Sequence, residues 1–418
     1  MHPKNSLLEE LSWRGMVYQH TDGLPDALAT GQLSAYAGFD PTAPSLHVGH
    51  LVPVMGLAHL QRAGHRPVAL VGGGTGMIGD PSGKTAERQL ASEEEIEKNS
   101  RALEKQLECF LDFSGPRAAL MRDNAEWLRP LKAVEFMRDV GKHFTVNYML
   151  AKDSVQSRIE GGISFTEFSY MLLQAYDFLE LNRREGVTLQ IGGSDQWGNI
   201  TAGLELIRRV EGKTAHALTM PLVTTASGSK FGKTEEGAVW LDPARTSPYK
   251  FYQYWINVDD KDAPKYLRLF TLLSRQEIEA LEKLIATAPE KREAQQALAR
   301  DVTARVHGVE AARLAEQVSG VLFGKSDPTS LTEPVLRAMS EEVPFAEALE
   351  TPGLIDALVT LKLAPSKSAA RRLVEQGGVS LNGQRANAET DLASASTLAG
   401  GYYLLRKGAR DYGLIRRS

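Results

Sequence analysis

The ten residues Pro41 to His50, PTAPSLHVGH, constrain the fold of this chain more than any other stretch. They follow the apolar run Leu33–Phe39 and precede a second apolar run, Leu51–Leu60. A strand, a turn of Pro and small residues, and an amphipathic helix in this order are typical of an α/β protein. A helix that starts at such a turn presents unpaired backbone N–H groups and the positive end of its dipole. We therefore expect the turn to bind an anion such as phosphate.

Two imidazoles lie at this turn. His47 and His50 are three residues apart, so they face the same way on a first helical turn. A zinc site is disfavoured because no Cys pair or HExxH partner accompanies them. A purely structural role is the simplest alternative for an isolated pair. Gly49 between them leaves the backbone open to a flat ligand, which favours neutral imidazoles that donate hydrogen bonds to a nucleotide.

A second apolar strand, residues 66–71, leads into the glycine-rich stretch 72–85, GGGTGMIGDPSGKT. Part of this stretch fits the dinucleotide-binding pattern GxGxxG of oxidoreductases. However, Asp80 and Pro81 interrupt the helix that the pattern requires, and the acidic residues about 20 positions on lie in a charged helical segment. The pattern is therefore not that of a nicotinamide cofactor site.

The end of the same stretch, GKT, is similar to the end of a P-loop. The first glycine of the P-loop pattern is replaced by Ile78, so this match also fails. We expect a loop that approaches phosphate or substrate closely without either standard cradle. Lys84 and Arg88 would extend from it as mobile cations.

The segment from Ile163 to Leu179 is helical in pattern. Tyr170, Gln174 and Asp177 fall on one face among apolar neighbours at 3.6 residues per turn. One interpretation is a polar stripe that faces water. The other is a set of polar groups directed into a pocket, which the scarcity of soluble surface on this helix makes at least as good.

A further strand, residues 187–191, contains Gln190 and leads into two glycines followed by Asp195 and Gln196. An acid and an amide at the carboxyl end of a strand are well placed to bind ribose hydroxyls or a substrate. Residues 219–224 are predicted to form another strand. The loop that follows, ASGSKFGKT, carries Lys230 and Lys233 and is by itself typical of a solvated surface turn.

Length, composition and charge limit the class of protein. A chain of 418 residues, 42% apolar and 24% charged, predicts a soluble globular protein of two or three domains. No membrane span or signal peptide is expected, and a single cysteine, Cys109, predicts a reducing cytoplasm. Residues 351–418 carry ten Lys or Arg and five Asp or Glu, a net +5, so the rest carries −9. A basic end suggests contact with a polyanion.

Four motifs in order resemble those of class I aminoacyl-tRNA synthetases. HVGH (residues 47–50) is similar to their first signature, HIGH. KFGKT (residues 230–234) is similar to their second signature, KMSKS, in the variant typical of tyrosyl-tRNA synthetases. GDPSGK (residues 79–84) and GGSDQ (residues 192–196) resemble segments of the bacterial tyrosine enzymes. The resemblance extends over essentially the whole chain, although Ala37 replaces a cysteine found in many relatives and Pro53 lies inside the opening helix.

The resemblance implies an ATP-dependent ligase that forms tyrosyl-adenylate and transfers tyrosine to tRNA(Tyr), with Mg²⁺ accompanying ATP and no tightly bound cofactor or metal site. It implies that adenine lies over Gly49 and that these residues act on the phosphates: Thr42, His47, His50, Lys84, Arg88, Lys230, Lys233 and Thr234. The implied ATP contacts also include Gly38, Asp40, Gly193 and Asp195. The implied tyrosine contacts are Tyr36 and Asp177 at the phenol, Asp80, Tyr170 and Gln174 at the α-ammonium, and Gln190 and Gln196.

The expected fold is a Rossmann-like parallel sheet over residues 1–225 with a helical insertion over about 124–186. A helical domain over 226–325, a linker over 326–350 and a small α+β RNA-binding domain over 351–418 follow. The last resembles the domain named after the fourth protein of the small ribosomal subunit, with Lys367, Arg371 and Arg372 on one helix face as RNA contacts. A homodimer through the segment around Phe165 is implied by the resemblance alone.

Two other classes remain open from the residues. A nicotinamide-dependent oxidoreductase would bind NAD in place of ATP. A non-catalytic RNA-binding protein derived from a synthetase would show no exchange of pyrophosphate into ATP with any amino acid. Within the family, tryptophan is the nearest alternative substrate, and Tyr36 with Asp177 argues against it.

Overall fold

The computed structural model describes residues 6–82, 91–226, 228, 231–234, 237–324, 327–348 and 351–417. The chain divides into two compact units. The first comprises Met1–Thr246 and Asn257–Val306, and the second comprises Ser247–Ile256 and His307–Ser418. Each unit has a sheet and an apolar interior of its own.

A six-stranded sheet forms the centre of the first unit, with the strand order β1-β6-β5-β2-β3-β4. Its neighbouring strands are parallel except β1 and β6, which are antiparallel. The strands are β1 (Gln19–His20), β2 (Ser34–Phe39), β3 (Arg66–Val71), β4 (Leu120–Asp123), β5 (Leu189–Gly193) and β6 (His216–Met220). The predicted parallel sheet is therefore confirmed.

The turn after β2 leads into helix α3 (Leu51–Arg62) through a single 3-10 turn, Val48–His50. Pro53 is the third residue of α3. It lies within the first helical turn, where the missing N–H removes no helical hydrogen bond. The predicted strand–turn–helix unit is confirmed, and the proline in the helix is accommodated without a break.

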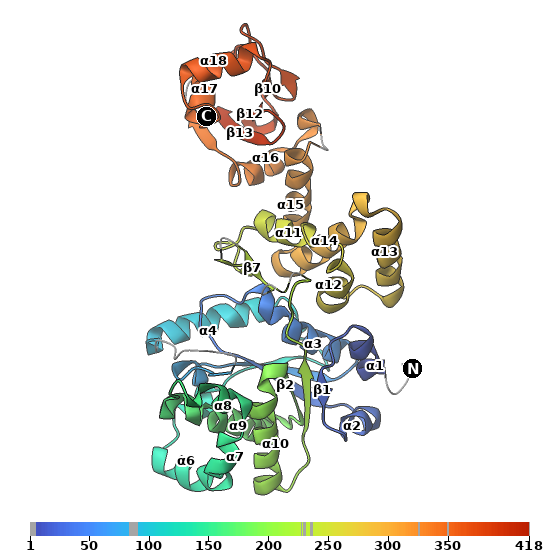
Figure 1. Ribbon diagram of the computed structural model, residues 1–418, viewed down its shortest axis with the longest axis vertical. Coiled ribbons are helices and arrows are strands. Elements are labelled where there is room, and N and C mark those ends of the chain that lie inside the picture. The colour runs from blue at the N-terminus through green and yellow to red at the C-terminus, as the bar shows by residue number, and fades with distance from the viewer. Residues whose placement is uncertain are drawn as a thin grey trace. The chain divides into compact units, whose positions relative to one another are not determined.

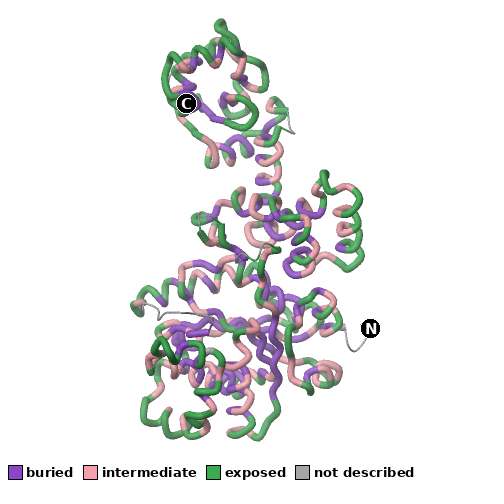
Figure 2. The backbone as a smooth tube through the Cα atoms, viewed as in Figure 1, coloured by how far each residue is buried: buried purple, intermediate pink, exposed green. Residues whose placement is uncertain are grey.

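Helices cover both faces of the sheet. The chain moves from β2 through α3 to β3 on one side, and from β5 through α10 (Trp197–Glu211) to β6 on the other. Because such crossovers are right-handed, α3 and α10 must lie on opposite faces, as Figure 1 shows. Figure 2 shows that the strands between them are largely buried. The helices before β2 and before β4 are α1 (Ser6–Trp13), α2 (Leu24–Thr30) and α4 (Glu93–Leu107).

The predicted helical insertion lies between β4 and β5. Its longest helix, α9, begins after Ser164, whose hydroxyl accepts a hydrogen bond from the backbone N–H of Glu167, and ends at Gly186 in the left-handed conformation. Helix α9 packs along α10 and places Phe178 in the core. The helices are α5 (Ala125–Leu128), α6 (Ala133–Asp139), α7 (Val146–Leu150), α8 (Asp153–Ile159) and α9 (Phe165–Glu185).

Three helices complete the first unit: α12 (Ala263–Phe270), α13 (Arg275–Thr287) and α14 (Glu293–His307). Helix α12 packs against α3, the helix that begins at the histidine turn. The buried guanidinium of Arg14 donates to the backbone carbonyls of Arg268, Thr271 and Leu273 at 2.9, 2.9 and 2.7 Å. These bonds join α1 to the turn between α12 and α13. None of the helices in the described parts of the chain is long and apolar enough to cross a membrane.

The second unit combines helices with a five-stranded sheet of order β11-β10-β12-β13-β9. Its helices are α11 (Pro248–Ile256), α15 (Val309–Leu322), α16 (Glu333–Ser340), α17 (Leu354–Thr360) and α18 (Lys367–Glu375). Its strands are β9 (Phe345–Ala348), β10 (Val379–Leu381), β11 (Gln384–Arg385), β12 (Tyr402–Lys407) and β13 (Asp411–Arg417). The predicted small α+β fold is confirmed.

The prediction of a linker over residues 326–350 was wrong for the described part of that range. It contains α16 and β9, and β9 pairs in parallel with β13 near the end of the chain. Leu336 and Met339 of α16 are fully buried against Leu404 and Leu414 of the sheet. The prolines in this segment start a helix and a strand rather than mark a disordered tether.

The strand expected over 219–224 ends at Met220, because Pro221 cannot donate to the ladder.

Two local features shape the small sheet and its helix. Helix α18 is capped by the hydroxyl of Ser366, which accepts from the backbone N–H of Ala369. The turn after β10 has Asn382 and Gly383 at φ 49° and 85°, the geometry of a tight hairpin turn.

Candidate active site

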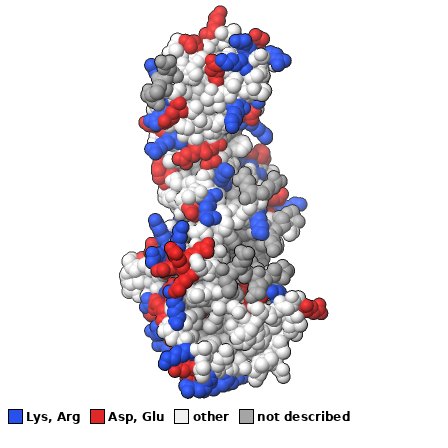
Figure 3. All heavy atoms as spheres, turned by 90° about the vertical axis from the view of Figure 1, so that its left-hand side faces the viewer, with Lys and Arg blue, Asp and Glu red and all other residues white. Residues whose placement is uncertain are grey.

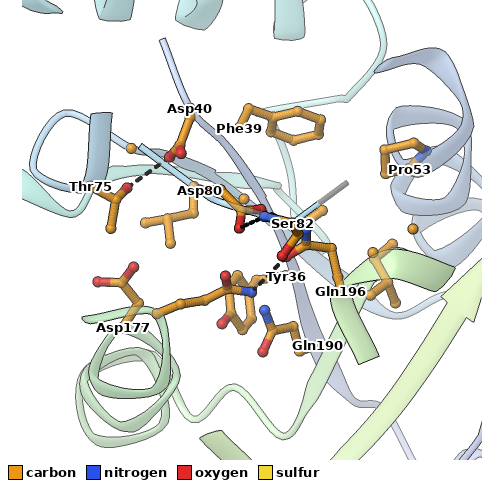
Figure 4. A pocket seen from close by; sticks show the side chains of 18 of the residues that line it. Tyr36, Phe39, Asp40, Pro53, Thr75, Asp80, Ser82, Asp177, Gln190 and Gln196 are labelled. Atoms are coloured by element: carbon orange, nitrogen blue, oxygen red, sulfur yellow. Dashed lines mark hydrogen bonds between the residues drawn. The ribbon is translucent and has the colours of Figure 1, made fainter. Parts of the chain in front are cut away.

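A cavity of about 280 Å³ lies at the carboxyl ends of β2 and β5. Strands β2 and β5 are neighbours, and the helices that follow them cover opposite faces of the sheet. The crevice between two such strands is the usual ligand-binding position in α/β sheets. Figure 4 shows side chains from β2, β5, α9 and the glycine-rich loop directed into this space. The predicted site residues that line it are Tyr36, Gly38, Asp40, Thr42, His50, Asp80, Tyr170, Gln174, Asp177, Gln190, Gly193, Asp195 and Gln196.

At one end of the cavity, the carboxyl group of Asp177 is held by two donors. The amide of Asn124 donates to one oxygen at 2.9 Å, and the indole N–H of Trp127 donates to the other at 2.7 Å. Tyr36 is 1% exposed, and its hydroxyl has no hydrogen-bond partner among the described residues. The buried carboxyl and hydroxyl can therefore both bond a polar atom of a ligand.

Burial raises the pKa of Asp177 from 3.8 to about 8, and the bonds from Asn124 and Trp127 only partly oppose that rise. Burial also raises the pKa of Tyr36, so its hydroxyl is neutral over the physiological range. A protonated Asp177 donates to a phenol oxygen, and an ionised one accepts from a phenol hydroxyl. Phenylalanine offers neither partner.

The Asp177 shift predicts how stability depends on pH. Between about pH 4 and pH 8 the folded protein holds a proton on Asp177 that the unfolded chain releases, so the free energy of unfolding falls as pH rises through this window. The loss is on the order of a few kcal/mol. Urea unfolding of the wild type and Asp177→Asn at pH 5 and pH 8.5 tests this. The wild type should lose stability relative to the variant, and a parallel response of both would contradict the shift.

Asp40 connects two parts of the cavity. One of its carboxylate oxygens accepts from the hydroxyl of Thr75 at 2.8 Å, and the other accepts from the hydroxyl of Tyr170 at 2.9 Å. Burial and the nearby carboxylates of Asp40 and Asp80 raise the pKa of Tyr170. Asn124 also donates to Thr75 at 2.9 Å. A continuous buried hydrogen-bond chain therefore runs from Asp177 to Tyr170.

Asp80 and Gln196 lie side by side in the cavity lining (Figure 4). The Gln196 amide donates to a carboxylate oxygen of Asp80 at 2.7 Å and accepts from Gln174 at 3.3 Å. The other Asp80 oxygen accepts from the backbone N–H of Ser82 at 2.9 Å. The common face predicted for Tyr170, Gln174 and Asp177 is confirmed, since all three point into the cavity. With Asp80 they form a polar, acidic wall suited to an ammonium group.

The two histidines have adjacent rings, with centroids 4.0 Å apart. His47 Nδ1 accepts from the backbone N–H of Gly49, and His50 Nδ1 accepts from the backbone N–H of His47, both at 3.1 Å. An Nδ1 that accepts carries no proton, so each neutral ring has its proton on Nε2. Each imidazole can therefore donate from Nε2, and that a nucleotide accepts this hydrogen bond stays a prediction.

The expectation for Gly49 needs a correction. A Cβ at this position would lie 2.8 Å from Cε1 and 2.9 Å from Nδ1 of His47. The missing side chain therefore makes room for the His47 ring rather than for a ligand on that side. Neither His47 nor Gly49 lines the cavity, whereas His50 does.

The second signature lies beside the histidine turn. Its described part forms a short hairpin of β7 (Lys233–Thr234) and β8 (Gly237–Ala238), with both side chains of β7 exposed. Gly232, at φ 78°, packs so closely on the turn that a Cβ would lie 2.7 Å from Cγ2 of Val48. Val48 donates its backbone N–H to the carbonyl of Val239 at 3.0 Å. Gly232 and Val239, on either side of this hairpin, are thus neighbours of Val48 in the histidine turn.

Three of the predicted cations, Lys84, Arg88 and Lys230, lie outside the described residues. Lys233 and Thr234 do not line the cavity. In the described part of the glycine-rich loop, residues 72–82, the backbone N–H groups of Gly73 and Gly74 donate to Asp123 and Asn124 at 3.0 and 2.7 Å and so do not face a phosphate. That the loop approaches phosphate or substrate closely stays a prediction.

Thr75, Asn124 and Trp127 were not predicted as site residues. Asp123 ends strand β4, which pairs with β3, and Asn124 follows it directly. A polar residue just after a strand is also the signal that identified Asp195 and Gln196 after β5. Applied to β4, that rule would have found Asn124. No sequence pattern marks Trp127, because its role depends on the insertion folding back on α9.

The parallel sheet, with two adjacent histidines in the turn after β2 and a lysine hairpin beside them, has the arrangement of a class I aminoacyl-tRNA synthetase. A profile of the family described as "tRNA synthetases class I (W and Y)" matches residues 28–324. A second, described as "Tyrosine--tRNA ligase SYY-like C-terminal domain", matches residues 336–415.

Curated relatives identify the branch of this family to which the chain belongs. A tyrosine–tRNA ligase of Anaeromyxobacter dehalogenans is 55% identical over 416 residues, 98% of this chain and 99% of the relative. The tyrosine–tRNA ligase of Geobacillus stearothermophilus is 52% identical over 417 residues, with the same coverage. The chain therefore belongs to the tyrosine–tRNA ligase family.

Solved structures of tyrosyl-tRNA synthetases are also similar to this chain. A C-terminally truncated mitochondrial tyrosyl-tRNA synthetase of Aspergillus nidulans has a TM-score of 0.70 and 30% identity, covering 76% of this chain and 94% of that one. A tyrosyl-tRNA synthetase of Archaeoglobus fulgidus complexed with L-tyrosine has a TM-score of 0.55 at 19% identity, covering 74% and 99%, and shares the fold. The nicotinamide-dependent alternative is excluded by the family.

Proposed function

We propose that the cavity binds tyrosine and ATP and forms tyrosyl-adenylate, which then charges tRNA(Tyr). The single observation that carries this proposal is the buried pair Tyr36 and Asp177 in the lining of a cavity that His50 also borders. Tyrosine has one phenol, one ammonium and one carboxylate, and the cavity offers a partner for each. Asp80, Tyr170 and Gln174 would take the ammonium, with Gln190 and Gln196 near the reacting carboxylate.

The reaction needs positioning and positive charge rather than a general base. The tyrosine carboxylate attacks the α-phosphorus of ATP, the bond between the α-phosphorus and the bridging oxygen breaks, and pyrophosphate leaves. Negative charge accumulates on the departing phosphates. We propose that the Nε2 protons of His47 and His50 and the ammonium of Lys233 stabilise that charge, since preorganised donors act most strongly there. Thr42, Lys84, Arg88, Lys230 and Thr234 are proposed to contribute at the same phosphates.

The ribose and the base would lie along the strand ends. Asp195 follows β5 at the rim of the cavity, where a carboxylate can accept from ribose hydroxyls. Gly38, Asp40 and Gly193 border the same space. Adenine would have to contact Gly49 on the side away from the His47 ring. Mg²⁺ would enter with the ATP phosphates and keep most of its water ligands.

Exchange of labelled pyrophosphate into ATP, measured with each of the twenty amino acids, tests the proposal. Tyrosine alone should support rapid exchange. Exchange with tryptophan and not tyrosine would overturn the assignment of the substrate. Absence of exchange with every amino acid would favour a non-catalytic RNA-binding protein.

Tyr36→Phe tests the phenol contact. Losing one neutral hydrogen bond should lower the tyrosine-to-phenylalanine ratio of kcat/KM by roughly threefold to tenfold, with little change in Tm. Tyr176→Phe is the matched control, because Tyr176 is a half-buried tyrosine of α9 that does not line the cavity. An unchanged ratio in Tyr36→Phe would refute the role.

We propose that the second unit binds the tRNA through α18. Arg371 and Arg372 are exposed on that helix. Lys367 is also exposed, and its ammonium lies 2.5 Å from a carboxylate oxygen of Asp356, so its charge is partly compensated. On the face drawn in Figure 3, basic and acidic side chains are interspersed. The RNA contact proposed here therefore rests on Arg371 and Arg372, with Lys367 as a partly compensated third cation.

The double variant Arg371→Ala with Arg372→Ala should raise the KM for tRNA(Tyr) in charging by roughly tenfold and reduce its salt dependence. Tyrosine-dependent pyrophosphate exchange should stay unchanged, because no tRNA takes part in it. Point variants are preferred to removal of residues 351–418, which would strip β13 from β9. Arg313→Ala, at a surface ion pair of α15, is the control. Equal charging by wild type and double variant would remove the case for α18.

A homodimer is proposed on the basis of an exposed apolar surface. The helical insertion exposes six large apolar side chains: Val134, Met137, Val146, Leu150, Ile159 and Phe165. Apolar groups gathered on one segment are typical of an interface. Light scattering should give twice the chain mass of 45.8 kDa, and a single mass would contradict the proposal.

A cytoplasmic location, to be checked by cell fractionation, is proposed because the one cysteine, Cys109, is free and exposed.

A further inference from the structure

The start of α12 contains an aspartate that does not do what its position predicts. Asp262 is the residue that precedes α12, a position at which aspartate normally accepts from the first helical N–H groups. Its side chain makes no such bond. Asp259 accepts from the backbone N–H of Lys261 at 2.8 Å instead, so the turn before the helix has its own cap.

The Asp262 carboxylate is directed to a distant segment of the chain. Both of its oxygens accept from the backbone N–H of Ala226, each at 3.0 Å. Asp262 is 8% exposed, so this bond is shielded from water. Hydrogen bonds to buried charged groups are among the stronger ones in proteins. Ala226 begins the segment that carries the KFGKT signature.

Helix α12 also contacts this segment further along, at Phe231. The Phe231 ring stacks on Phe270 at 5.0 Å and contacts the edge of Tyr266 at 5.0 Å. Phe231 is the residue before Gly232, which packs on Val48 of the histidine turn. Lys265 of α12 also donates to the carbonyl of Thr224 at 3.3 Å. Helix α12 and the residue before it therefore contact the chain ahead of the lysine signature, at Thr224 and Ala226, and within it, at Phe231.

From these contacts we propose that Asp262 is a positioning residue for adenylate formation, with Phe231 as its apolar counterpart. The carboxylate fixes the chain entering the signature, and the aromatic stack fixes the chain two residues before Lys233. Helix α12 packs on α3, which follows His50 directly, so the segment that leads to Lys233 and the histidine turn contact the same pair of packed helices. Asp262 acts through Lys233 and touches no substrate. This inference rests on the proposed function of the site.

Three variants test the inference. Asp262→Ala removes both acceptor oxygens, and Asp262→Asn retains one. Asp259→Asn removes the same charge at the same helix end while keeping a capping side chain. Asp262→Ala should lower kcat of tyrosine-dependent exchange about tenfold, with the KM for tyrosine within about twofold. Asp262→Asn should recover most of that loss, and Asp259→Asn should behave as wild type.

A double-mutant cycle separates positioning from general destabilisation. In the Lys233→Ala background, Asp262→Ala should cost less than about twofold, because the group that it positions is already absent. The full tenfold loss in both backgrounds would overturn the inference, as would a loss in Asp262→Ala matched by a proportional rise in the KM for tyrosine.

Limited trypsin digestion gives a readout that needs no activity. Cleavage between residues 224 and 240, identified by mass, should be at least about fivefold faster in Asp262→Ala than in wild type, because the chain is released at one end. Asp259→Asn should match wild type. If Asp262→Ala and wild type were cleaved at equal rates, the inference that Asp262 fixes the chain at Ala226 would be wrong, even if exchange is active. If the wild-type protein showed no pyrophosphate exchange, the proposed function would be refuted. The digestion alone would then test whether Asp262 fixes the chain at Ala226.

Discussion

Replacing Lys233 by alanine should lower kcat for tyrosine-dependent pyrophosphate exchange by roughly 10²- to 10³-fold. Lys233 lies on the exposed edge of the β7–β8 hairpin, so the change leaves the core intact and Tm should not move. Its ammonium would interact with the departing phosphates as they gain charge, an interaction that is stronger in the transition state than in the ground state. The dissociation constant for tyrosine should therefore stay within about twofold of wild type.

Lys261→Ala serves as the control for Lys233→Ala. It removes an equally exposed lysine from the loop before α12. Exchange by this variant should equal that of wild type. If Lys233→Ala weakened tyrosine binding as much as it slowed exchange, the lysine would be part of uniform substrate binding and the proposed transition-state role would be wrong.

Asp177→Asn should lower kcat/KM for tyrosine by roughly 10- to 100-fold and also lower Tm at pH 5. The wild-type carboxyl receives donors from both Asn124 and Trp127. An amide can accept on one atom only, so its NH₂ would face one of these donors in the interior. A buried donor left without an acceptor costs about 1–3 kcal/mol.

A second substitution makes this prediction specific. Asn124→Asp in the Asp177→Asn background turns the facing donor into an acceptor, and the oxygen that accepts from Gly74 is retained. Tm should recover in the double variant, whereas selectivity against phenylalanine should not, since the group facing the phenol is still an amide. Asp139→Asn, at an exposed ion pair of the same insertion, controls for loss of charge. No recovery of Tm would show that the donor–acceptor argument is wrong.

The elements that the sequence predicted best are those whose formation depends on a few residues close together in the sequence. Strand β3 and the strand–turn–helix around His50 follow from apolar runs broken by Pro and Gly, and both agree with the structure within a residue or two. The face shared by Tyr170, Gln174 and Asp177 follows from helical periodicity alone. In each case a few neighbouring residues decide the outcome.

The features that sequence reasoning missed depend on contacts between distant segments. Asn124 and Trp127 reach Asp177 from about fifty residues away. Strand β9 was taken for a linker because its partner, β13, lies at the other end of the domain. Asp262 looks like an ordinary capping residue, and only the fold brings it to Ala226. Gly49 is small because His47 folds back over it, which no spacing rule indicates.

The central claim is that the carboxylate of tyrosine attacks the α-phosphorus of ATP in this cavity. Tyrosine labelled with ¹⁸O in its carboxylate, incubated with the protein, ATP and tRNA(Tyr), tests it directly. Mass spectrometry of the AMP released after charging should find one ¹⁸O atom per AMP, because the attacking oxygen remains on phosphorus when the tRNA hydroxyl takes the acyl group. AMP without the label, or ADP as the nucleotide product, would contradict the account.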